Sequence, residues 1–440
     1  MATILFIGQS TKQFSYYETS IRELVVRGHI VVLRYDIVFS RGTIYPALQN
    51  FLIESNATKF KWMSKAGLFA RYISYFSREL RSYSWYLSRS DQSQYYTDRW
   101  ADLFPGIMPN ILKIEWVKRI IRHSTCLKLL ETLERLMPAP CAVIKDIKAV
   151  LPDLVYVSPG NLRYSNEIAY VKAASKLGIP SVISVLSWDN LTNKGLFHWT
   201  PDIFLTWNRH HEEELKTLHA IDNERIKMVG AQLFDKWAQR DESFLPDEGL
   251  LEYTKDPYML YLGSSSNIAK DESKVLKNIT SQVLQKGHSC RIIFKPHPAH
   301  YEYYQKLSID YVILLPKQFG LSETLQDIAN FHHLVMSARC VIGINTSGFL
   351  DSVLIGKRTF AYLSAEHEQT QRLSAHYRLL TDYKVIIETN SYEQMVDLTD
   401  NDSAFIKNRN LFLASFVRPH GEANLAGFHA ADVIESIINR

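Results

Sequence analysis

The residues with the most evident chemistry follow one short apolar segment. The run 292–294 is continued directly by Lys295, Pro296, His297 and Pro298, which predicts a buried strand with an abrupt end. Proline has a fixed φ and no N–H to donate, so the loop that leaves this strand is expected to be stiff. A stiff loop that presents a lysine and a histidine is suited to bind phosphate. The alternative is an ordinary strand end with a solvated lysine and a capped histidine.

Two further segments place small and hydroxylated residues after predicted strands. Residues 263–266 read Gly-Ser-Ser-Ser, and residues 345–348 read Asn-Thr-Ser-Gly just before a predicted helix. The free N–H groups and the dipole of a helix N-terminus favour anions. Because the strands of a doubly wound sheet end at one edge, where ligands bind, we expect the three loops to converge. The predicted donor-phosphate ligands are Ser264, Ser265, Lys295, His297, Thr346, Ser347 and Gly348.

Asp351 lies four residues after Ser347, one helical turn further on the same face. A carboxylate at that position can bind ribose or sugar hydroxyls of a nucleotide-linked substrate. The alternative is a first-turn acid that only interacts favourably with the helix dipole.

The first half of the chain offers a matching loop at 187–195, directly after the apolar run 181–186. Asp189 is the candidate general base for an acceptor hydroxyl, and Asn190 is a candidate acceptor ligand. Gln9 and Ser10 follow the first predicted strand and are expected to share the same cleft. Asp and Asn are also common turn residues, so a purely local role is the alternative.

These loops require alternating strands and helices to position them. Helices are predicted at 17–26 and 168–177, ended by Gly28 and Gly178, and another at 272–285. Strands are predicted at 4–8, 30–33, 153–157, 181–186, 203–207, 226–229, 258–262, 291–295, 311–315, 340–344, 359–362 and 385–387. The fold class is therefore α/β, with two Rossmann-like doubly wound domains.

The predicted domain limits follow from the restart of this alternation. An N-terminal Rossmann-like acceptor domain is expected at 1–237 and a polar linker at 238–257. A C-terminal nucleotide-donor domain is expected at 258–416, and residues 417–440 are expected to form a helix that crosses back to the first domain.

Residues 56–130 interrupt the alternation, with no convincing strand. Between Lys59 and Arg89 there are seven Lys or Arg and one acid, Glu79, with tyrosine, phenylalanine and tryptophan interleaved. We interpret the segment as a helical, aromatic and basic insertion. One hypothesis is a surface for anionic lipid or for an anionic or lipid-linked acceptor. The slightly favoured alternative is an insertion packed on the sheet, because aromatics at helical spacing are more often core.

Composition narrows the class of protein. The chain of 440 residues has a net charge of +4, which does not indicate a nucleic-acid binder. Its four cysteines have no metal-ligand spacing, which favours free thiols in a reducing compartment. The start of the chain has no leader-like pattern, and no apolar run is long enough to span a membrane. We therefore expect a cytoplasmic protein, soluble or peripheral to the inner face of the membrane.

The chain resembles the GT-B glycosyltransferase superfamily, in which two Rossmann-like domains face a cleft. The segment 24–29 resembles the N-terminal unit of that superfamily. Lys-Pro-His-Pro at 295–298, followed by Asn-Thr-Ser-Gly at 345–348, is similar to the capsule-polysaccharide and CDP-glycerol polyol-phosphate transferases and to the His-Pro-motif sialyltransferases. The segment 416–422 resembles the tail of the polyol-phosphate group. The resemblance implies that His297, Thr346 and Ser347 hold the donor phosphate, that Lys295 adds a counter-charge, and that Asp351 lies near the donor.

The resemblance also implies the reaction. We expect a metal-independent glycosyltransferase, without cofactor, that moves a sugar from a nucleotide-activated donor to a glycan or lipid-linked acceptor, with cytidine weakly favoured as the base. The alternatives are a CDP-polyol phosphotransferase, a non-hydrolysing nucleotide-sugar epimerase and a non-catalytic GT-B binding protein. The N-terminal half lacks a recognisable acidic pair of the family, and the 56–130 insertion matches nothing in it.

Overall fold

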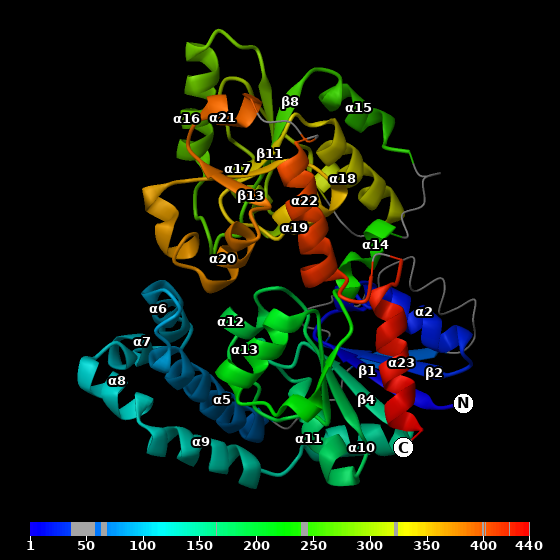
Figure 1. Cartoon of the computed structure of the whole chain (residues 1–440). Helices are drawn as coiled ribbons and strands as arrows, with labels where there is room; N and C mark the ends of the chain where they lie inside the picture. Colours follow the sequence, from blue (N-terminus) through cyan, green and yellow to red (C-terminus); the bar gives the residue numbers. More distant parts are fainter. Residues whose placement is uncertain are drawn as a thin grey trace. The chain divides into compact units, whose positions relative to one another are not determined.

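The computed structural model describes residues 1–36, 58–62, 68–163, 165–238, 245–320, 324–397, 400, 402–421 and 423–439 (Figure 1). The chain forms two compact units. Unit 1 contains Met1–Asp235 and Ala414–Arg440, and unit 2 contains Lys236–Leu413. Each unit is built on one parallel sheet, which confirms the predicted α/β class with two doubly wound sheets. Residues 239–244 of the predicted linker lie outside the described residues.

Unit 1 has a seven-stranded sheet in the order β3-β2-β1-β4-β5-β6-β7, and its strand pairs are parallel. The strands are β1 Thr3–Gly8, β2 Ile30–Tyr35, β3 Thr58–Trp62, β4 Leu154–Ser158, β5 Ser181–Ser184, β6 Ile203–Thr206 and β7 Ile226–Met228. The chain order reverses between β1 and β4. Ligands of doubly wound sheets bind at such a switch point, beyond the carboxyl ends of the strands.

The prediction that residues 56–130 contain no strand is wrong at one end. β3, Thr58–Trp62, pairs in parallel with β2 and forms the edge of the sheet. Its sequence alternates lysine with aromatic residues, a period of two that is typical of a strand. Lysine is also common on edge strands, where charge opposes pairing with other chains. The helical part of the insertion therefore begins after this strand.

Both faces of the sheet in unit 1 are buried. Ile4 and Phe6 point to a core that includes α2 (Glu18–Val26) and α23 (Ala426–Ile438). On α23, Gly427 lies so close to α2 that a Cβ would stand 2.5 Å from Cβ of Thr19. The helices α10 (Cys141–Val150) and α11 (Ile168–Leu177) pack together, and α11 also contacts β4 and β5.

The predicted helix ends in unit 1 are confirmed. Gly28 and Gly178 both have positive φ, 87° and 69°, the left-handed conformation that glycine adopts without a Cβ penalty. Each follows the end of a predicted helix, α2 and α11, and the next strand begins within a few residues.

The insertion of unit 1 contains a separate aromatic core. Its helices are α5 (Leu68–Ser88), α6 (Gln94–Asp102), α7 (Met108–Leu112), α8 (Glu115–Arg122) and α9 (Ser124–Leu136). Tyr83, Trp85, Tyr86, Tyr96 and Trp100 are buried in it. These rings therefore stabilise the insertion rather than form an exposed surface.

Unit 2 has a six-stranded sheet in the order β10-β9-β8-β11-β12-β13, again parallel throughout. The strands are β8 Tyr258–Leu262, β9 Arg291–Lys295, β10 Val312–Leu314, β11 Val341–Gly343, β12 Thr359–Tyr362 and β13 Ile386–Thr389. The switch point lies between β8 and β11. Successive residues of β8 alternate between two cores, with Met259 and Tyr261 in one and Leu260 and Leu262 in the other.

The helices of unit 2 cover both faces of that sheet. One core includes α16 (Ser273–Gln285), α17 (Tyr301–Tyr304) and α21 (Tyr392–Asp397); the other includes α15 (Glu248–Thr254) and α18 (Leu325–Ser337). The remaining α-helices of the part of the chain that the structure describes are α1 Lys12–Ser15, α12 Asn190–Asn193, α13 Arg209–His219, α14 Asp235–Ala238, α19 Gly348–Ile355, α20 Ala375–Asp382 and α22 Ser403–Phe412. Within the described ranges, no helix is both long and apolar enough to cross a membrane.

Candidate functional site

The three motifs that are predicted to bind phosphate follow three adjacent strands of unit 2. β8 is hydrogen-bonded to β9 on one side and to β11 on the other, and Leu262 pairs with Lys295. Because the strands are parallel, the loops that begin at Gly263, Pro296 and Ile344 leave the same edge of the sheet. Two of these loops flank the switch point, where a doubly wound sheet binds its ligand.

The backbones of these loops approach each other closely. The Gly263 N–H donates to the Lys295 carbonyl over 2.8 Å. A Cβ on Gly263 would stand 2.9 Å from Cα of Pro296 and 3.1 Å from the backbone nitrogen of His297. Glycine is therefore required at this position, because any side chain would separate the two loops.

Ser264 connects the two loops at the switch point. Its side chain is completely buried, and its hydroxyl accepts the Asn345 N–H over 3.4 Å. Ser265, Thr346 and Gly348 are half-buried, and Ser347 is exposed. Ser264 therefore holds the loops together, whereas the other predicted hydroxyls are accessible to a ligand.

A buried glutamate, Glu272, stabilises this edge through hydrogen bonds. Glu272 accepts the Ser264 N–H over 3.0 Å and the Tyr261 hydroxyl over 3.1 Å. Burial raises the pKa of Glu272 to about 8, although these donors act in the opposite direction. The carboxyl group therefore keeps its proton to a higher pH than an exposed glutamate does, which reduces the negative charge beside the loop that begins at Gly263.

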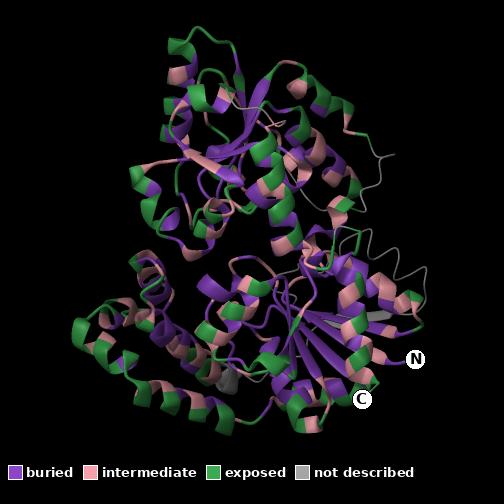
Figure 2. Cartoon of the chain, in the orientation of Figure 1, coloured by how far each residue is buried: buried purple, intermediate pink, exposed green. Residues whose placement is uncertain are grey.

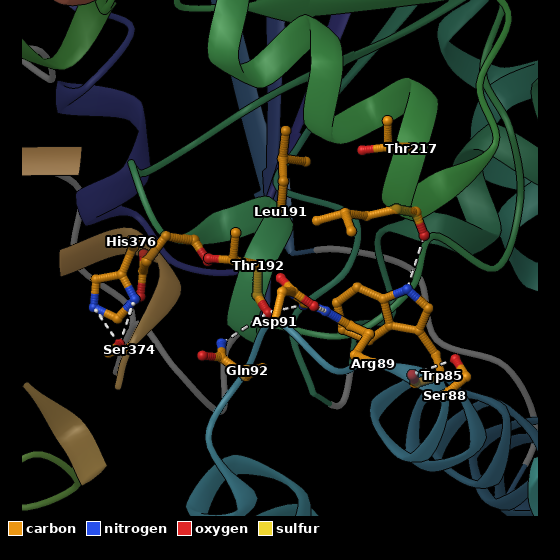
Figure 3. A network of polar contacts seen from close by, with 12 residues as sticks. Trp85, Ser88, Arg89, Asp91, Gln92, Leu191, Thr192, Thr217, Ser374 and His376 are labelled. Atoms are coloured by element: carbon orange, nitrogen blue, oxygen red, sulfur yellow. Dashed lines mark hydrogen bonds and ion pairs between the residues drawn. The ribbon is translucent and has the colours of Figure 1, made fainter. Parts of the chain in front are cut away.

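Asn345 is held from a second direction. Its side-chain amide donates to the Thr370 carbonyl over 2.6 Å and lies 3.3 Å from Nε2 of His376. His376 is in turn 2.9 Å from the Ser374 hydroxyl, and Figure 3 shows this pair. These contacts fix the residue that precedes Thr346.

The imidazole of His297 has a defined orientation. Its Nδ1 accepts the Ala299 N–H over 3.2 Å, so in the neutral ring the proton is on Nε2. The Nε2–H is then a hydrogen-bond donor. This geometry fits both the predicted phosphate ligand and the alternative of a capping histidine, since the cap uses only Nδ1.

Lys295 and Asp351 have partners that the sequence did not indicate. Nζ of Lys295 stands 5.5 Å from the centre of the Phe331 ring on α18. The Asp351 carboxylate accepts the Trp237 indole N–H over 2.8 Å and lies 3.3 Å from Nζ of Lys236. Asp351 is thus engaged in fastening α14 to α19, and a role toward the donor sugar stays a prediction.

The predicted residues of unit 1 lie at the carboxyl edge of its own sheet. Gln9 and Ser10 follow β1, and both backbone N–H groups donate to Oε1 of Gln13, over 2.6 and 3.3 Å. The Gln9 amide donates to the Arg163 carbonyl over 3.1 Å. This bond joins the loops after β1 and β4, the two strands at the switch point of unit 1.

Asp189 follows β5 and precedes the short helix α12. Its Oδ1 accepts the Ser187 hydroxyl over 2.5 Å, and its Oδ2 is 3.0 Å from Nζ of Lys194. The side chain is 16% exposed, so a substrate hydroxyl can approach it. The arrangement is compatible with a general base that is oriented by two neighbours.

Asn190 is completely buried and acts within the loop. Its Oδ1 accepts the Leu186 N–H over 2.9 Å, and its amide donates to Oδ1 of Asn161. The Asn161 amide donates back to the Asn190 and Gly195 carbonyls over 3.0 and 3.1 Å. The pair of asparagines therefore ties the loop after β4 to the loop after β5, and an acceptor contact stays a prediction.

The helical insertion braces the Asp189 loop (Figure 3). Arg89 and Gln92, which follow α5, both donate to the Thr192 carbonyl, the second over 3.2 Å. The Arg89 guanidinium lies 4.5 Å from the Trp85 ring centre, and the Trp85 indole donates to the Leu218 carbonyl over 2.8 Å. One function of the insertion is thus to position α12.

Sequence reasoning missed two carboxyl groups at this edge. Asp36 follows β2 and Glu167 precedes α11, and both are buried. Asp36 accepts the Asn166 amide over 2.9 Å. Neither oxygen of Glu167 has a hydrogen-bond partner among the described residues. Burial raises the pKa of Glu167 to about 7, and the Asp36 charge contributes to the increase, while the nearby Ser165 hydroxyl and Gly160 N–H oppose it.

The sequence around Asp36 and around Glu167 gives little indication of a functional role. Asp36 and Glu167 are separated by more than a hundred positions in the chain, and neither lies in a recognisable motif. The strand order alone brings them to one edge. Elsewhere in the described chain, no three His, Cys, Asp or Glu side chains are grouped as a metal ion would require.

Fold and site together define a two-unit protein with a Rossmann-like sheet in each half, and comparisons with solved structures agree. The chain is similar to S. aureus MnaA, solved with UDP, with a TM-score of 0.56, 11% identity and coverage of 100% of this chain and 97% of that one. It is similar to the UDP-GlcNAc 2-epimerase of Methanocaldococcus jannaschii in complex with UDP-GlcNAc and UDP, with a TM-score of 0.52, 13% identity and coverage of 99% and 100%.

A third similar structure is CalG4, the calicheamicin glycosyltransferase, with a TM-score of 0.51, 12% identity and coverage of 100% of both chains. These comparisons show that the chain has the predicted GT-B-like fold. No family model matches the chain, and no curated protein matches it in sequence. The narrower resemblance to polyol-phosphate transferases and sialyltransferases stays a prediction.

Proposed function

We propose that the protein is a nucleotide-sugar-dependent enzyme that transfers a glycosyl group to an acceptor hydroxyl, in the synthesis of a cell-surface polysaccharide or glycolipid. The observation that carries the proposal is the switch point of unit 2. There, the absence of a side chain on Gly263 lets the backbone of His297 approach closely, and the Ser264 hydroxyl accepts the N–H of Asn345. This edge presents neutral donors and an imidazole, which is the chemistry that binds a diphosphate.

Each group has a proposed role in the transfer. Asp189 takes the proton of the acceptor hydroxyl while the acceptor oxygen bonds to the anomeric carbon of the sugar. The bond between that carbon and the phosphate oxygen breaks, and the electron pair leaves with the nucleotide. The Nε2–H of His297, the hydroxyls of Thr346 and Ser347 and the N-terminus of α19 offset the resulting charge.

Uridine is the base to test first. MnaA was solved with UDP, and the M. jannaschii epimerase with UDP-GlcNAc and UDP. We therefore place uridine before the cytidine that the motif resemblance favours. CMP and CDP sugars form the second group of a donor panel.

The decisive experiment measures donor binding and turnover with that panel. We expect calorimetry to detect binding of one nucleotide class, and nucleotide release to increase when an acceptor extract is added. Release that occurs only with a CDP-polyol would instead support a polyol phosphotransferase. A chain that binds no nucleotide would exclude the proposal.

Two substitutions of His297 separate its possible roles. His297→Ala removes both the Nε2–H and the cap on Ala299, whereas the asparagine of His297→Asn retains an acceptor for the Ala299 N–H. If Nε2–H contacts the phosphate, both variants lose roughly ten- to hundredfold in donor affinity, the value of one charge-assisted hydrogen bond. Normal affinity of His297→Asn alone would show that His297 acts only through the loop, and the melting temperature should barely change in either variant.

A second candidate function is epimerisation of a nucleotide-linked sugar. The observation in its favour is Glu167, whose pKa of about 7 suits a group that removes and returns a proton near neutral pH. In heavy water an epimerase of this kind would exchange a carbon-bound hydrogen of the sugar for deuterium, without acceptor and without net nucleotide release. Deuterium incorporation that disappears in Glu167→Gln would favour this candidate over glycosyl transfer.

A further inference from the structure

Two helices of the insertion expose apolar side chains along their outer faces. On α8, Trp116 is 64% exposed and Ile120 is 58% exposed. On α9, Leu129 and Leu133 are 59% and 45% exposed. In both helices the two residues are four positions apart, so they lie one above the other on a single face. The apolar side chains therefore form a stripe on each helix.

The helices α8 and α9 pack into the insertion through other residues than those of the stripes. α8 buries Ile121 and α9 buries Leu130 in the insertion. The helices are consecutive in the chain, contact each other, and carry long exposed segments (Figure 2). A surface helix normally directs its apolar residues to the core and polar residues to solvent. A second apolar face, at a cost in solubility, indicates that something covers it.

Basic residues accompany the stripes. Arg119 and Arg122 on α8 and Lys128 on α9 are exposed, and none of them has a carboxylate partner among the described residues. The acids of α9 are already engaged, because Glu131 pairs with Arg135 over 2.7 Å and the buried Glu134 pairs with Arg78 over 2.8 Å. The surface therefore combines exposed apolar side chains with unpaired positive charge.

We propose that this surface docks on an anionic lipid bilayer. We call it the α8–α9 face and define it by Trp116, Ile120, Leu129 and Leu133 with Arg119, Arg122 and Lys128. Helices that lie in the membrane interface bury an apolar stripe at the boundary of the acyl chains and place Lys or Arg near anionic headgroups. Tryptophan is favoured at that depth because its ring is apolar and its N–H is polar.

The charge pattern favours lipid over a second copy of the chain. A twofold interface brings the same patch of two copies together, so the cations of one copy would meet those of the other. Juxtaposed like charges disfavour such an interface. An anionic bilayer instead neutralises all three cations at once. The α8–α9 face lies outside the segment 59–89 for which the sequence suggested lipid binding. In that segment the rings of Tyr83, Trp85 and Tyr86 are buried, whereas those of Tyr72 and Phe76 are exposed.

The test is co-sedimentation of the full chain with vesicles, without any nucleotide or acceptor. We expect binding to vesicles that contain phosphatidylglycerol, weak binding to pure phosphatidylcholine, and a decrease as salt is added. The variant Trp116→Ser/Ile120→Ser should lose roughly tenfold or more in binding, because each buried apolar side chain contributes to insertion. The matched control is Leu284→Ser/Leu411→Ser, which removes two exposed leucines of unit 2 and should bind as the unchanged protein does.

A second variant, which removes the three positive charges, tests the proposal even if Trp116→Ser/Ile120→Ser folds poorly. Arg119→Gln/Arg122→Gln/Lys128→Gln should lose roughly hundredfold in binding to anionic vesicles, since each cation near such a surface contributes about fivefold. Absence of binding by the unchanged protein, or equal binding by the unchanged and charge variants, would overturn the proposal. A concentration-dependent dimer that Trp116→Ser/Ile120→Ser abolishes would overturn it in favour of a second copy. Because the readout requires no donor, this result is independent of the proposed function.

Discussion

Glu167 of unit 1 and Glu272 of unit 2 are both buried near the carboxyl edge of their sheets, and the two differ in their partners. Glu272 of unit 2 accepts hydrogen bonds from Ser264 and Tyr261, whereas neither oxygen of Glu167 in unit 1 has a partner within the described residues. Burial raises the pKa of both, to about 8 and about 7. A raised pKa alone therefore does not distinguish a carboxyl group that stabilises a loop from one that is available for chemistry.

The same contrast extends to the two edges as a whole. The sheets share the strand order around their switch points. In unit 2 the loops at this edge present hydroxyls, backbone N–H groups and the His297 imidazole. In unit 1 they carry the carboxyl groups of Asp36, Glu167 and Asp189, of which Asp36 and Glu167 are buried. The same strand order thus carries different side chains in the two units, because the loops and not the sheet determine which groups lie at the edge.

The largest effect is expected for the candidate base of unit 1. Asp189→Asn should lower the rate of transfer by roughly 10²- to 10⁴-fold, the usual contribution of a general base, and leave donor affinity unchanged. Steady-state kinetics and calorimetry measure the two quantities. Asp153→Asn is a suitable control, because that carboxylate accepts the N–H of Thr3 at the start of β1, away from the carboxyl edge. A normal rate for Asp189→Asn would assign the base to another residue.

The next effect concerns the close approach of loops in unit 2. Gly263→Ala should reduce the free energy of unfolding by about 1–3 kcal/mol, as overpacking does, and weaken donor binding, because the new Cβ collides with the backbone at Pro296. Denaturant titration and calorimetry test both. Gly320→Ala in the same unit is the control, since its nearest atom would be 4.0 Å away. Equal behaviour of the two variants would contradict the packing argument.

Replacing each glutamate by glutamine tests the comparison directly. Near pH 4, where both carboxyl groups are largely protonated in the folded and in the unfolded chain, Glu272→Gln should cost about 1–3 kcal/mol of unfolding free energy, because the amide nitrogen cannot accept a hydrogen bond and leaves a buried donor unsatisfied. Glu167→Gln should change the unfolding free energy less at that pH, since neither oxygen of Glu167 has a hydrogen-bond partner of normal geometry among the described residues. Denaturant titrations of both variants measure the difference. A large loss in Glu167→Gln would mean that its carboxyl group is structural after all.

The pH dependence of stability has a definite sign for both groups. A carboxyl group whose pKa is raised binds its proton more tightly in the folded state than in the unfolded chain. The resulting stability is present below the ordinary pKa of 4.5 and is lost as the pH rises through about 7 for Glu167 and about 8 for Glu272. Glu167→Gln should remove the part of the decline between pH 4.5 and 7, measured by urea unfolding at several pH values. An unchanged slope would show that Glu167 does not titrate in this range.

The smallest effect is expected at Asp351. Asp351→Asn weakens the contacts to Trp237 and Lys236, and the expected loss is about 1 kcal/mol of stability, typical of a single hydrogen bond. Donor affinity should remain the same within error. A drop in donor affinity without a change in melting temperature would support the predicted role of Asp351 at the donor sugar.

The sequence predicted the regular part of the fold well, because its strands are apolar runs that end at Gly, Pro or polar residues. The strand at 258–262 and the helix that Gly178 ends are examples. β3 was missed, since an edge strand that alternates lysine with aromatics lacks the apolar run of a buried strand. Each end of β10 and of β11 differs by one residue from the prediction, as strand ends often do.

The candidate site was predictable only where residues are close in the chain. The three loops of unit 2 each contain a local motif, and the parallel order brings them to one edge. Glu167 and Asp36 have no local motif, and their environment arises from burial by distant segments. Asn190 was placed in the right loop, but its amide is used by Asn161, a contact that no spacing in the sequence indicates.

The position of α23 has a consequence for how the chain is made. Ala430, Ala431 and Ile434 complete the core beneath β1 and β2, and Asp235 caps the start of this helix through the N–H groups of Ala426 and Gly427. A ribosome synthesises all of unit 2 before these residues appear. Synthesis of unit 1 therefore starts before that of unit 2 and ends after it. Until α23 is made, part of the apolar surface of the unit 1 sheet stays uncovered. Unit 2 is continuous in sequence and can finish folding earlier, so chaperones would be needed mainly for the half that starts the chain.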